Sequence, residues 1–251
     1  MSFDLRLGSC LDAATGLAAM AAQSIDVTIM DPPYEAEAHT KMRRAMAGLK
    51  GEDREVTAAD LPFPAITEAE RMAVAAEVAR VTSRWILVFC QVEGAPKWAR
   101  ALEAAGAQYV RTMVWVKPDG QPQLTGDRPG MGYESIVVAH RKGRKRWNGG
   151  GRTGVFVYNK SDGSRHPHPT TKPQPLMREL VSLFSDPGEI VLDPFAGSGS
   201  TGVACGMLGR RFLGWELSPE YHAIAMRRLR GEEAKPRPEQ PSLFDAIGGA
   251  A

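Results

Sequence analysis

The chain has 251 residues, of which 43% are hydrophobic and 24% charged, and its formal net charge is +2. That composition is typical of a soluble globular protein with one α/β core and at most a small appended lobe. A net charge so near zero excludes nucleic-acid binding through the field of the whole chain, so such affinity needs local basic clusters.

No signal peptide and no apolar run of membrane-spanning length is found in the sequence. The three cysteines, Cys10, Cys90 and Cys205, are odd in number and lack the spacing of a metal or redox site. We therefore expect a cytoplasmic protein without a metal, whose cysteines are buried free thiols in a reducing compartment.

The first elements in chain order are a strand over residues 3–7, a helix over 11–22 and an apolar strand over 25–30. The second strand runs into Asp31-Pro32-Pro33-Tyr34, a sequence suited to capturing a flat ring that bears an amine. Asp31 and the Pro32 carbonyl can accept hydrogen bonds from the amine, Pro33 rigidifies the turn, and Tyr34 offers a stacking face. The alternative is a plain Pro-Pro turn. Residues 35–60 are charged and weakly periodic, which predicts a mobile loop.

The middle of the chain continues the alternation of helices and strands. Thr67 and Glu70 form a capping box that predicts a helix reaching Thr82, and a second helix is expected over 95–105. Three apolar segments predict strands over 85–89, 112–116 and 135–139. We expect the last two to form an antiparallel pair at the edge of the sheet.

A basic stretch with an aromatic residue and three glycines follows the last of these strands. Its cations and tryptophan are Arg141, Lys142, Arg144, Lys145, Arg146, Trp147 and Arg152. Cations beside an aromatic ring and a pliable backbone suit phosphate contacts and insertion into a groove. The alternative is a solvated loop, which is how most runs of charge behave.

Near the C-terminus, a helix bracketed by Pro173 and Pro187 precedes a strand that leads into Gly197-Ser198-Gly199 and a further helix. The glycines permit a tight turn whose backbone can lie against a ligand. Nineteen residues after Gly197, Glu216 ends the next strand, where an acid can bind the two hydroxyls of a ribose. The pattern predicts a nucleoside-cofactor site.

Two kinds of nucleotide site do not fit this pattern. A dinucleotide dehydrogenase needs several strand–helix units after its glycine turn, whereas 35 residues follow Glu216. A phosphate-binding P-loop needs a lysine that Gly199-Ser200-Thr201 lacks. Earlier strands must therefore complete the sheet, and the cofactor-binding half comes last in the chain.

The order of these features resembles the permuted "beta" group of S-adenosylmethionine-dependent amino-methyltransferases that act on DNA. The resemblance spans roughly residues 4–230 and is carried by Asp31–Tyr34 and by Asp193–Thr201. Residues 168–173 match the segment before the helix at the methionine end of the cofactor, and 217–221 match the continuation of the ribose-binding strand.

This resemblance implies a Rossmann-like class I methyltransferase fold, with a doubly wound, mostly parallel seven-stranded sheet and an antiparallel edge hairpin. Residues 1–230 would form the catalytic domain, with a small target-recognition insert over 140–168, and residues 231–251 a flexible tail. The family's opening strand commonly ends in Gly-Asp where this chain has Gly8-Ser9, so its adenine contact would pass to Ser9 or to Asp12. The residues expected at S-adenosylmethionine are Ser9, Cys10, Asp31, Thr171, Lys172, Asp193, Phe195, Ala196, Gly197, Ser198, Gly199, Thr201, Glu216 and Leu217.

The implied activity is methyl transfer to the exocyclic amine of a base flipped out of double-stranded DNA, as in restriction–modification systems. A 5-methylcytosine enzyme would need a Pro-Cys pair, whereas the three cysteines follow Ser9, Phe89 and Ala204. In the family, Asp at the position of Asp31 goes mostly with adenine, which favours adenine N6. The alternatives are cytosine N4 by the same mechanism, and a non-catalytic nucleic-acid-binding module with a vestigial cofactor pocket.

The C-terminal tail is charged and proline-rich but contains Gln240-Pro241-Ser242-Leu243-Phe244. This segment resembles the short peptide by which bacterial replication and repair proteins bind the polymerase sliding clamp. Gln240, Leu243 and Phe244 match that peptide, and Pro241 departs from the usual leucine. The alternative is that the apolar pair folds back onto the domain. A homodimer is also expected, because the resembling family often dimerises.

Overall fold

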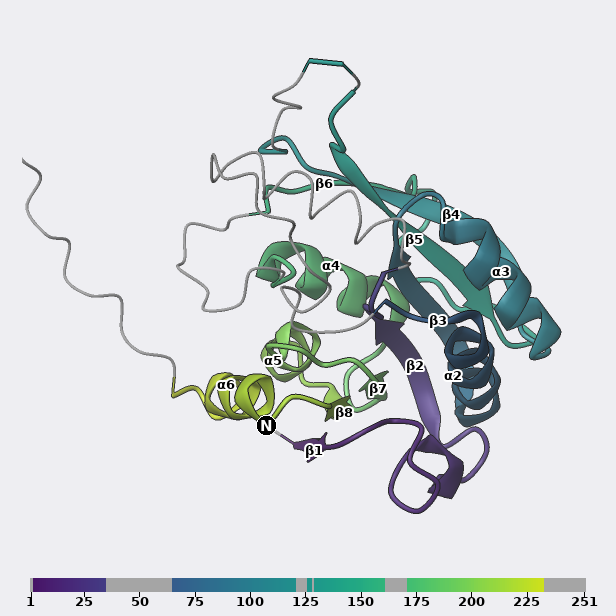
Figure 1. Cartoon of the computed structure of the whole chain (residues 1–251), viewed down its shortest axis with the longest axis vertical. Helices are drawn as coiled ribbons and strands as arrows, with labels where there is room; N and C mark the ends of the chain where they lie inside the picture. Colours follow the sequence, from purple (N-terminus) through teal and green to yellow (C-terminus); the bar gives the residue numbers. More distant parts are fainter. Residues whose placement is uncertain (1, 35–64, 121–125, 128, 161–170, 233–251) are drawn as a thin grey trace, which may run out of the picture.

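The computed structural model describes residues 2–34, 65–120, 126–127, 129–160 and 171–232 (Figure 1). In this part of the chain an eight-stranded sheet has the order β1-β8-β7-β2-β3-β5-β4-β6. All of its strands run parallel except β5, which is antiparallel to both of its neighbours. The strands are β1 (Phe3–Leu7), β2 (Ile25–Met30), β3 (Thr82–Cys90), β4 (Gln108–Val116), β5 (Tyr133–His140), β6 (Val155–Val157), β7 (Ile190–Asp193) and β8 (Arg211–Glu216).

The strand order reverses between β2 and β7, which lie side by side although about 160 residues separate them in the sequence. We call the edge of the sheet where β2, β7 and β8 end the carboxyl edge, and the opposite one the amino edge. Because β5 runs backwards, Tyr133 at its start lies at the carboxyl edge, and His140 pairs with Trp85 near the amino edge. In open α/β sheets, ligands bind at the carboxyl edge where the strand order reverses.

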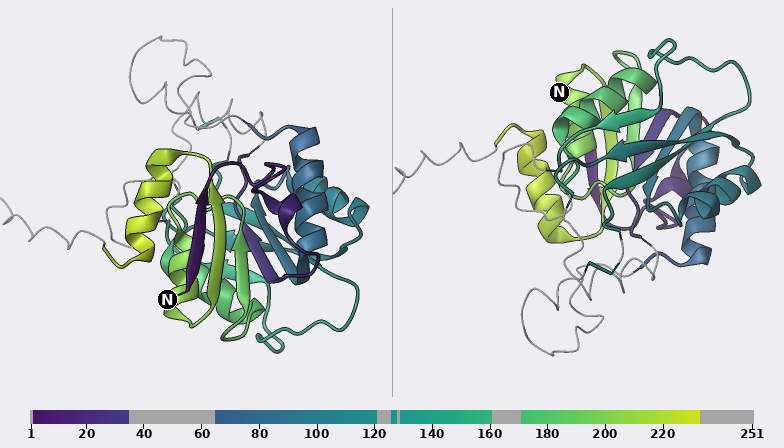
Figure 2. Two further views of the ribbon diagram at one scale, coloured as in Figure 1. Left: turned by 90° about the horizontal axis from the view of Figure 1, so that it is seen from below. Right: turned by 90° about the horizontal axis from the view of Figure 1, so that it is seen from above.

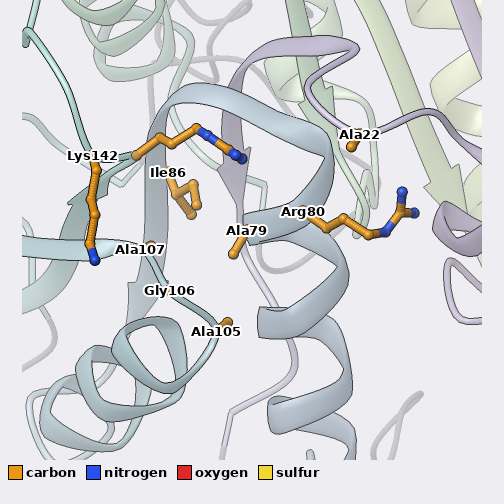
Figure 3. Close-up of a pocket in the computed structure, with 9 residues that line it drawn as sticks. Ala22, Ala79, Arg80, Ile86, Ala105, Gly106, Ala107 and Lys142 are labelled. Atoms are coloured by element: carbon orange, nitrogen blue, oxygen red, sulfur yellow. The ribbon is translucent and has the colours of Figure 1, made fainter.

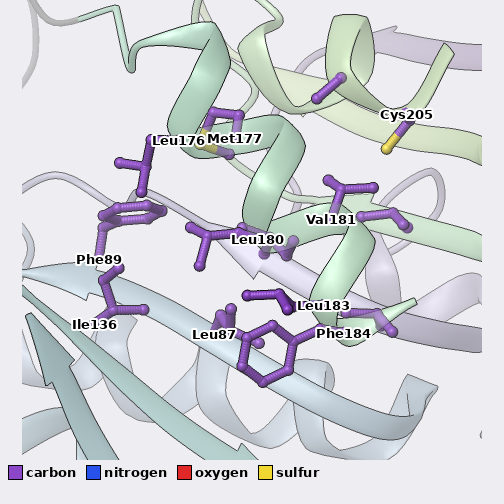
Figure 4. Close-up of a cluster of buried hydrophobic side chains, with 14 of the residues drawn as sticks. Leu87, Phe89, Ile136, Leu176, Met177, Leu180, Val181, Leu183, Phe184 and Cys205 are labelled. Atoms are coloured by element: carbon purple, nitrogen blue, oxygen red, sulfur yellow. The ribbon is translucent and has the colours of Figure 1, made fainter. Parts of the chain in front are cut away.

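Helices cover both faces of the sheet (Figures 1 and 2). On one face lie α2 (Glu68–Val81) and α3 (Ala95–Ala104), and on the other α4 (Gln174–Phe184), α5 (Ser200–Met207) and α6 (Pro219–Leu229). Figure 4 shows how the apolar side of α4, with Leu176, Leu180 and Phe184, packs over Leu87 and Phe89 of β3. Each such side chain stabilises the fold by about 1.5–3 kcal/mol through its removal from water. The doubly wound α/β class is confirmed.

The local signals for helix starts are confirmed. Directly before α2, the Thr67 backbone N–H donates to Glu70 Oε2 at 2.8 Å and the Glu70 N–H donates to Thr67 Oγ1 at 3.2 Å. Ser218 caps α6 by accepting from the Tyr221 N–H at 3.3 Å. These contacts need only residues three apart, which is why the sequence alone could specify them.

The helix expected over residues 11–22 is wrong. In its place stands a single 3₁₀ turn, η1 (Leu17–Ala19). Asp12 Oδ1 accepts from the backbone N–H groups of Ala14 at 3.0 Å and Thr15 at 2.8 Å. This local alternative to helical hydrogen bonding holds the segment as a turn.

The number of strands and the place of the hairpin also need correction. The described residues form eight strands rather than seven, because β6 lies inside the predicted insert and pairs with β4. The β4–β5 pair is antiparallel as expected, but it does not form the edge of the sheet, since β6 covers β4. A three-residue strand inside a basic, glycine-rich stretch is too short to show periodicity.

Two predicted segments, the loop over 35–60 and the tail from residue 233 onward, lie outside the described residues. So do Gln240, Leu243 and Phe244, and also residues 168–170 of the segment before α4. Within the described ranges, no helix has the length and apolar character needed to cross a membrane.

Candidate active site

Asp31 lies at the point where the strand order reverses, directly after β2 and beside the end of β7. Pro32 is buried, and the Tyr34 carbonyl accepts from the Ile66 N–H at 3.3 Å, which ties the end of the turn to the start of the next segment. Asp31 Oδ2 accepts from the Lys172 ammonium at 2.6 Å. The other oxygen, Oδ1, is buried and has no hydrogen-bond partner among the described residues. The site therefore presents an unused buried acceptor.

Four charged side chains meet here, and we call them the buried charge cluster: Asp31, Lys172, Glu134 and Lys117. The Lys172 ammonium lies 3.3 Å from Glu134 Oε2, and Lys117 binds Glu134 Oε1. Lys172 is only 8% exposed and Glu134 only 9%. The two acids and two cations thus alternate in sign along a row of side chains that is largely out of water.

Burial and charge act in opposite directions on these groups. Burial raises the pKa of Asp31, and the nearby Lys172 charge opposes that rise. Burial would also raise the pKa of Glu134, but Lys172 and Lys117 outweigh it and the pKa is lowered. Burial would lower the pKa of Lys172, but Asp31 and Glu134 hold it well above its usual value. Lys172 is therefore a permanent cation beside Asp31.

Sequence reasoning missed Glu134 and Lys117 entirely. Lys117 follows the predicted strand over 112–116 and Glu134 precedes the one over 135–139, and neither position carries a motif. The antiparallel pairing of β4 and β5 places the end of one strand beside the start of the other, with Trp115 opposite Glu134. The available signal was a lysine and a glutamate flanking two strands expected to pair.

The predicted glycine turn joins β7 to α5. Gly197 and Gly199 adopt positive φ of 53° and 79°, which side-chain-bearing residues rarely do. A Cβ at Gly202 would lie 2.6 Å from Leu229 and 2.8 Å from Phe212, so a glycine there lets α5 pack closely against α6 and β8. Around Gly197 the space is open: among the described residues, the Phe195 carbonyl at 4.0 Å is the only atom near a hypothetical Cβ.

Glu216 stands beside this turn at the end of β8. Its Oε2 accepts from the Gly197 N–H and its Oε1 from the Ser218 N–H, both at 2.8 Å. Each oxygen keeps a further lone pair for a ligand hydroxyl. Burial raises the pKa of Glu216, and the backbone N–H groups oppose that rise. Next to it, Leu217 is 68% exposed.

Asp193 turns inward rather than toward the open side of the turn. It is 3% exposed, and it accepts from Thr201 Oγ1 at 2.6 Å and from the Phe195 N–H at 3.0 Å. Burial raises its pKa to about 7, against the effect of these hydrogen bonds. Asp193 and Thr201 therefore hold the turn in shape.

The remaining predicted cofactor residues surround the same turn. Thr171 Oγ1 lies 3.1 Å from Ser198 Oγ, and Ala196 is buried beneath the turn. The Gly8 N–H donates to the Glu216 carbonyl at 2.9 Å, which brings Ser9 and Cys10 to the same edge. Burial raises the pKa of Cys10 to about 12, so it is a neutral thiol. Their role at a cofactor stays a prediction.

The basic stretch lies at the other edge of the sheet. It follows His140, the last residue of the backward strand β5, which spans roughly 23 Å at 3.3 Å per residue. Glu134 of the buried charge cluster lies near the start of that strand, so Lys142 and Arg144 are separated from the cluster by about the depth of the sheet. Both are exposed.

Most other members of this stretch contact their own chain. Lys145 donates to Gln108 Oε1 at 2.8 Å, Arg146 contacts Glu189 at 3.0 Å, and Arg152 pairs with Glu179. The Trp147 ring packs edge-on against Phe184, with ring centroids 4.9 Å apart. DNA contact by this stretch stays a prediction, at a place removed from the buried charge cluster.

A pocket of about 350 Å³ also opens at the amino edge, between the ends of α2 and α3 (Figure 3). Ile86 and Ala79 line it, and Arg80 and Lys142 stand at its sides. The Arg80 guanidinium is already bound to Glu77 and to the Met20 carbonyl. The pocket lies at the opposite edge of the sheet from Asp31 and is not part of the candidate active site. Among the described residues, no group of His, Cys, Asp and Glu could hold a metal ion.

Comparisons with known proteins agree with this geometry. Residues 147–227, which include the glycine turn and Glu216, match the family model described as DNA methylase. This segment of the chain is therefore similar to DNA methylases. The chain is 34% identical over 146 residues to the type II methyltransferase M.Cfr9I of Citrobacter freundii, covering 54% of this chain and 49% of that protein. It is 48% identical over 62 residues to the DNA adenine methyltransferase YhdJ of Escherichia coli strain K12, covering 25% of this chain and 21% of that one.

Two solved structures of DNA methyltransferases share the fold over nearly the whole length of the chain. The crystal structure of the M1.HpyAVI–SAM complex has a TM-score of 0.67 at 23% identity, covering 90% of this chain and 98% of that chain. The cytosine-N4-specific PvuII DNA methyltransferase has a TM-score of 0.72 at 14% identity, covering 94% of this chain and 89% of that chain. By sequence, the chain spans about half the length of the first curated methylases it matches.

Proposed function

We propose that this protein transfers a methyl group from S-adenosylmethionine to the exocyclic N6 of adenine, within a specific sequence of double-stranded DNA, after base flipping. The observation that carries the proposal is the buried Asp31 Oδ1, an acceptor without a partner among the described residues. It stands beside a proline carbonyl and a tyrosine, next to a glycine turn that lies within the segment similar to DNA methylases.

The residues at the turn fit the cofactor. The open space above Gly197 allows a ligand to approach the backbone, and Glu216 keeps lone pairs for ribose hydroxyls. The exposed Leu217 offers an apolar surface for an adenine ring. Thr171 and Ser198 stand at the end of the turn nearest Lys172 and Asp31, where the methionine end would lie. When bound, the cofactor supplies an electrophilic methyl group.

The rest of the chemistry belongs to the protein's own groups. A base inside a duplex cannot present its amine to Asp31, so it must be flipped out, and Tyr34 would stack on it. Asp31 Oδ1 and the Pro32 carbonyl would accept from the amine and draw its nitrogen out of conjugation with the ring. Direct displacement needs no protein nucleophile, so positioning supplies much of the acceleration.

Adenine is favoured over cytosine by the aspartate at position 31 and by the similarity to YhdJ, which is named a DNA adenine methyltransferase. The second candidate is cytosine N4 methylation by the same mechanism, favoured by the similarity in fold to the cytosine-N4-specific PvuII enzyme. A non-catalytic module with a vestigial pocket is disfavoured, because the turn, Glu216 and Asp31–Tyr34 are all in place.

DNA would approach the carboxyl edge, where β2 ends directly before Asp31 and where β4 and β6 also end. We further propose a role in restriction–modification in a cytoplasmic setting, a proposal supported by the similarity to a protein named a type II methyltransferase. Docking of Gln240, Leu243 and Phe244 on a sliding clamp and formation of a homodimer remain proposals. Clamp docking is tested with a peptide of residues 236–247 and its Leu243→Ala, Phe244→Ala form. Equal binding of the two peptides to a bacterial clamp would contradict it.

The function is tested by methylating unmodified DNA with the purified protein and S-adenosylmethionine, then identifying the modified base and its sequence context. We expect N6-methyladenine in a short motif. Asp31→Ala should lower turnover by about 10²–10³-fold or more, because it removes an acceptor aimed at the reacting amine. Glu216→Ala should weaken cofactor affinity, measured by calorimetry, because it removes the acceptor expected for the ribose hydroxyls. Wild-type turnover in Asp31→Ala would overturn the assignment.

A further inference from the structure

The buried charge cluster contains more than the proposed reaction needs. The chemistry uses Asp31 as an acceptor, yet Lys172, Glu134 and Lys117 come with it from three other segments of the chain. A carboxyl group that lies partly out of water and beside a second carboxylate tends to take up a proton. A protonated Asp31 would present a hydrogen-bond donor on one oxygen, and it would be a weaker acceptor for the amine.

We propose that Lys172 is a positioning residue for methyl transfer, whose ammonium keeps Asp31 a carboxylate with Oδ1 free for the amine, and that the Lys117–Glu134 pair fixes the place of that ammonium. This inference rests on the function proposed above. It assigns Lys172 to the catalytic carboxylate rather than to the cofactor contact that the sequence suggested.

The geometry supports this role, because Lys172 contacts only one of the two Asp31 carboxylate oxygens. The Lys172 ammonium donates to Oδ2 at 2.6 Å, which leaves Oδ1 as the oxygen without a partner among the described residues. A single cation on one oxygen fixes the rotation of the carboxylate and so the direction in which the other oxygen points. The side chain of Lys172 is only 9% exposed, so it cannot exchange this contact for water without a rearrangement.

The position of Lys172 is in turn set by its surroundings. Glu134 holds its ammonium from a second side at 3.3 Å, and the Phe89 and Tyr34 rings lie 5.0 Å and 5.8 Å from it. Lys117 occupies the other oxygen of Glu134. With two cations and two acids the cluster is formally neutral, and its members alternate in sign.

A buried charge cluster that only stabilised the fold would lead to a different expectation. Removing one of its charges would then lower the free energy of unfolding without changing the pH at which the enzyme loses activity. The groups that act on the charge of Asp31 are Lys172, Glu134, Lys117, Asp193 and Tyr34. Burial raises the pKa of Asp31 and Lys172 is the largest influence that lowers it, while Glu134 raises it further. Removing Lys172 should therefore raise the pKa of Asp31, and removing the charge of Glu134 should lower it.

Single-turnover methylation at saturating cofactor and DNA, followed between about pH 5 and pH 9, tests the inference. The active form of Asp31 is the carboxylate, so activity falls as pH drops through its pKa. We expect the acid limb of Lys172→Met to move up by about one pH unit or more relative to wild type. Lys172→Arg, which keeps the charge, should leave that limb close to the wild-type position even if its rate is lower.

Glu134→Gln is the second arm, because it keeps the shape of the side chain and should move the limb in the opposite direction, to lower pH. It also serves if Lys172→Met does not fold, as judged by thermal unfolding. Acid limbs that coincide with wild type in a folded Lys172→Met, or in Glu134→Gln when Lys172→Met does not fold, would overturn the inference while leaving the proposed function intact. Absence of methyl transfer by the wild-type protein would instead overturn the function itself.

Discussion

The two edges of the sheet carry clusters with the same formal charges in different settings. At the carboxyl edge Asp31 and Glu134 meet Lys117 and Lys172, and at the amino edge Asp186 and Glu189 meet Arg84 and Arg146. The Lys172 side chain is 9% exposed, whereas that of Arg146 is 56% exposed.

The partners of the two clusters differ as well. At the amino edge, Arg84 also donates to the Phe184 carbonyl at 3.5 Å, so the cluster fastens α4 to the sheet. At the carboxyl edge, Asp31 is the last member of the buried charge cluster, and its Oδ1 accepts no hydrogen bond from a described residue. Two acids and two cations do not by themselves mark a functional site, and the buried acceptor left over is what distinguishes this one.

The largest expected effect comes from breaking the buried cluster. Glu134→Ala would leave Lys117 and Lys172 without their shared partner in a dry environment. Removing one member of a buried ion pair typically costs about 3–5 kcal/mol of the free energy of unfolding. Urea unfolding at neutral pH measures this loss in the free energy of unfolding. A loss below about 1 kcal/mol would show that the buried cluster contributes no more than exposed ion pairs do.

The matched change at the amino edge is Arg146→Ala. Its side chain is 56% exposed, and exposed ion pairs contribute about 0–1 kcal/mol. Arg84 still pairs with Glu189 in this variant. We expect the same urea experiment to give a loss of no more than about 1 kcal/mol, and a loss as large as that of Glu134→Ala would erase the contrast between the edges.

Asp193 predicts a pH dependence at the carboxyl edge. Its pKa in the folded protein is raised to about 7, above the value of about 3.9 for an unfolded chain. The folded state therefore binds more protons between these values, and this group makes stability fall as pH rises from about 4 to 7, by at most ~1.4 kcal/mol per pH unit. Asp193→Asn should remove that downward contribution, which the difference in unfolding free energy between variant and wild type across this range will show. A difference that does not change with pH would contradict the raised pKa.

The smallest effect is expected from the basic stretch. If Lys142 and Arg144 each bound a phosphate of duplex DNA, replacing both by alanine would flatten the slope of log affinity against log salt by about 1.8. Since both residues stand at the amino edge, we expect the double variant to flatten it by less than about 1. Equilibrium binding at several salt concentrations measures the slope. The full reduction would instead show that this stretch binds DNA and that the duplex extends along the side of the sheet.

Much of the site was determined by the sequence alone, because its signals are local. A strand running into Asp31-Pro32-Pro33-Tyr34 and a glycine turn followed by an acid each specify a shape within about twenty residues. The capping box of Thr67 and Glu70 is equally local and was predicted correctly. Local reasoning was wrong for residues 11–22, where the bonds of Asp12 to Ala14 and Thr15 replace a helix.

What the tertiary structure decided is which distant charges meet. Lys172 and Asp31 are 141 residues apart, and Glu134 joins them because one strand of the sheet runs backwards. The same reversal carries the basic stretch to the opposite edge. Strand direction and register are set by how the whole sheet buries its two faces, not by the residues at either end of a strand. Charges carry no periodic signal of their partners, so only the folded sheet shows that Asp31 is held by Lys172 and Lys172 by Glu134.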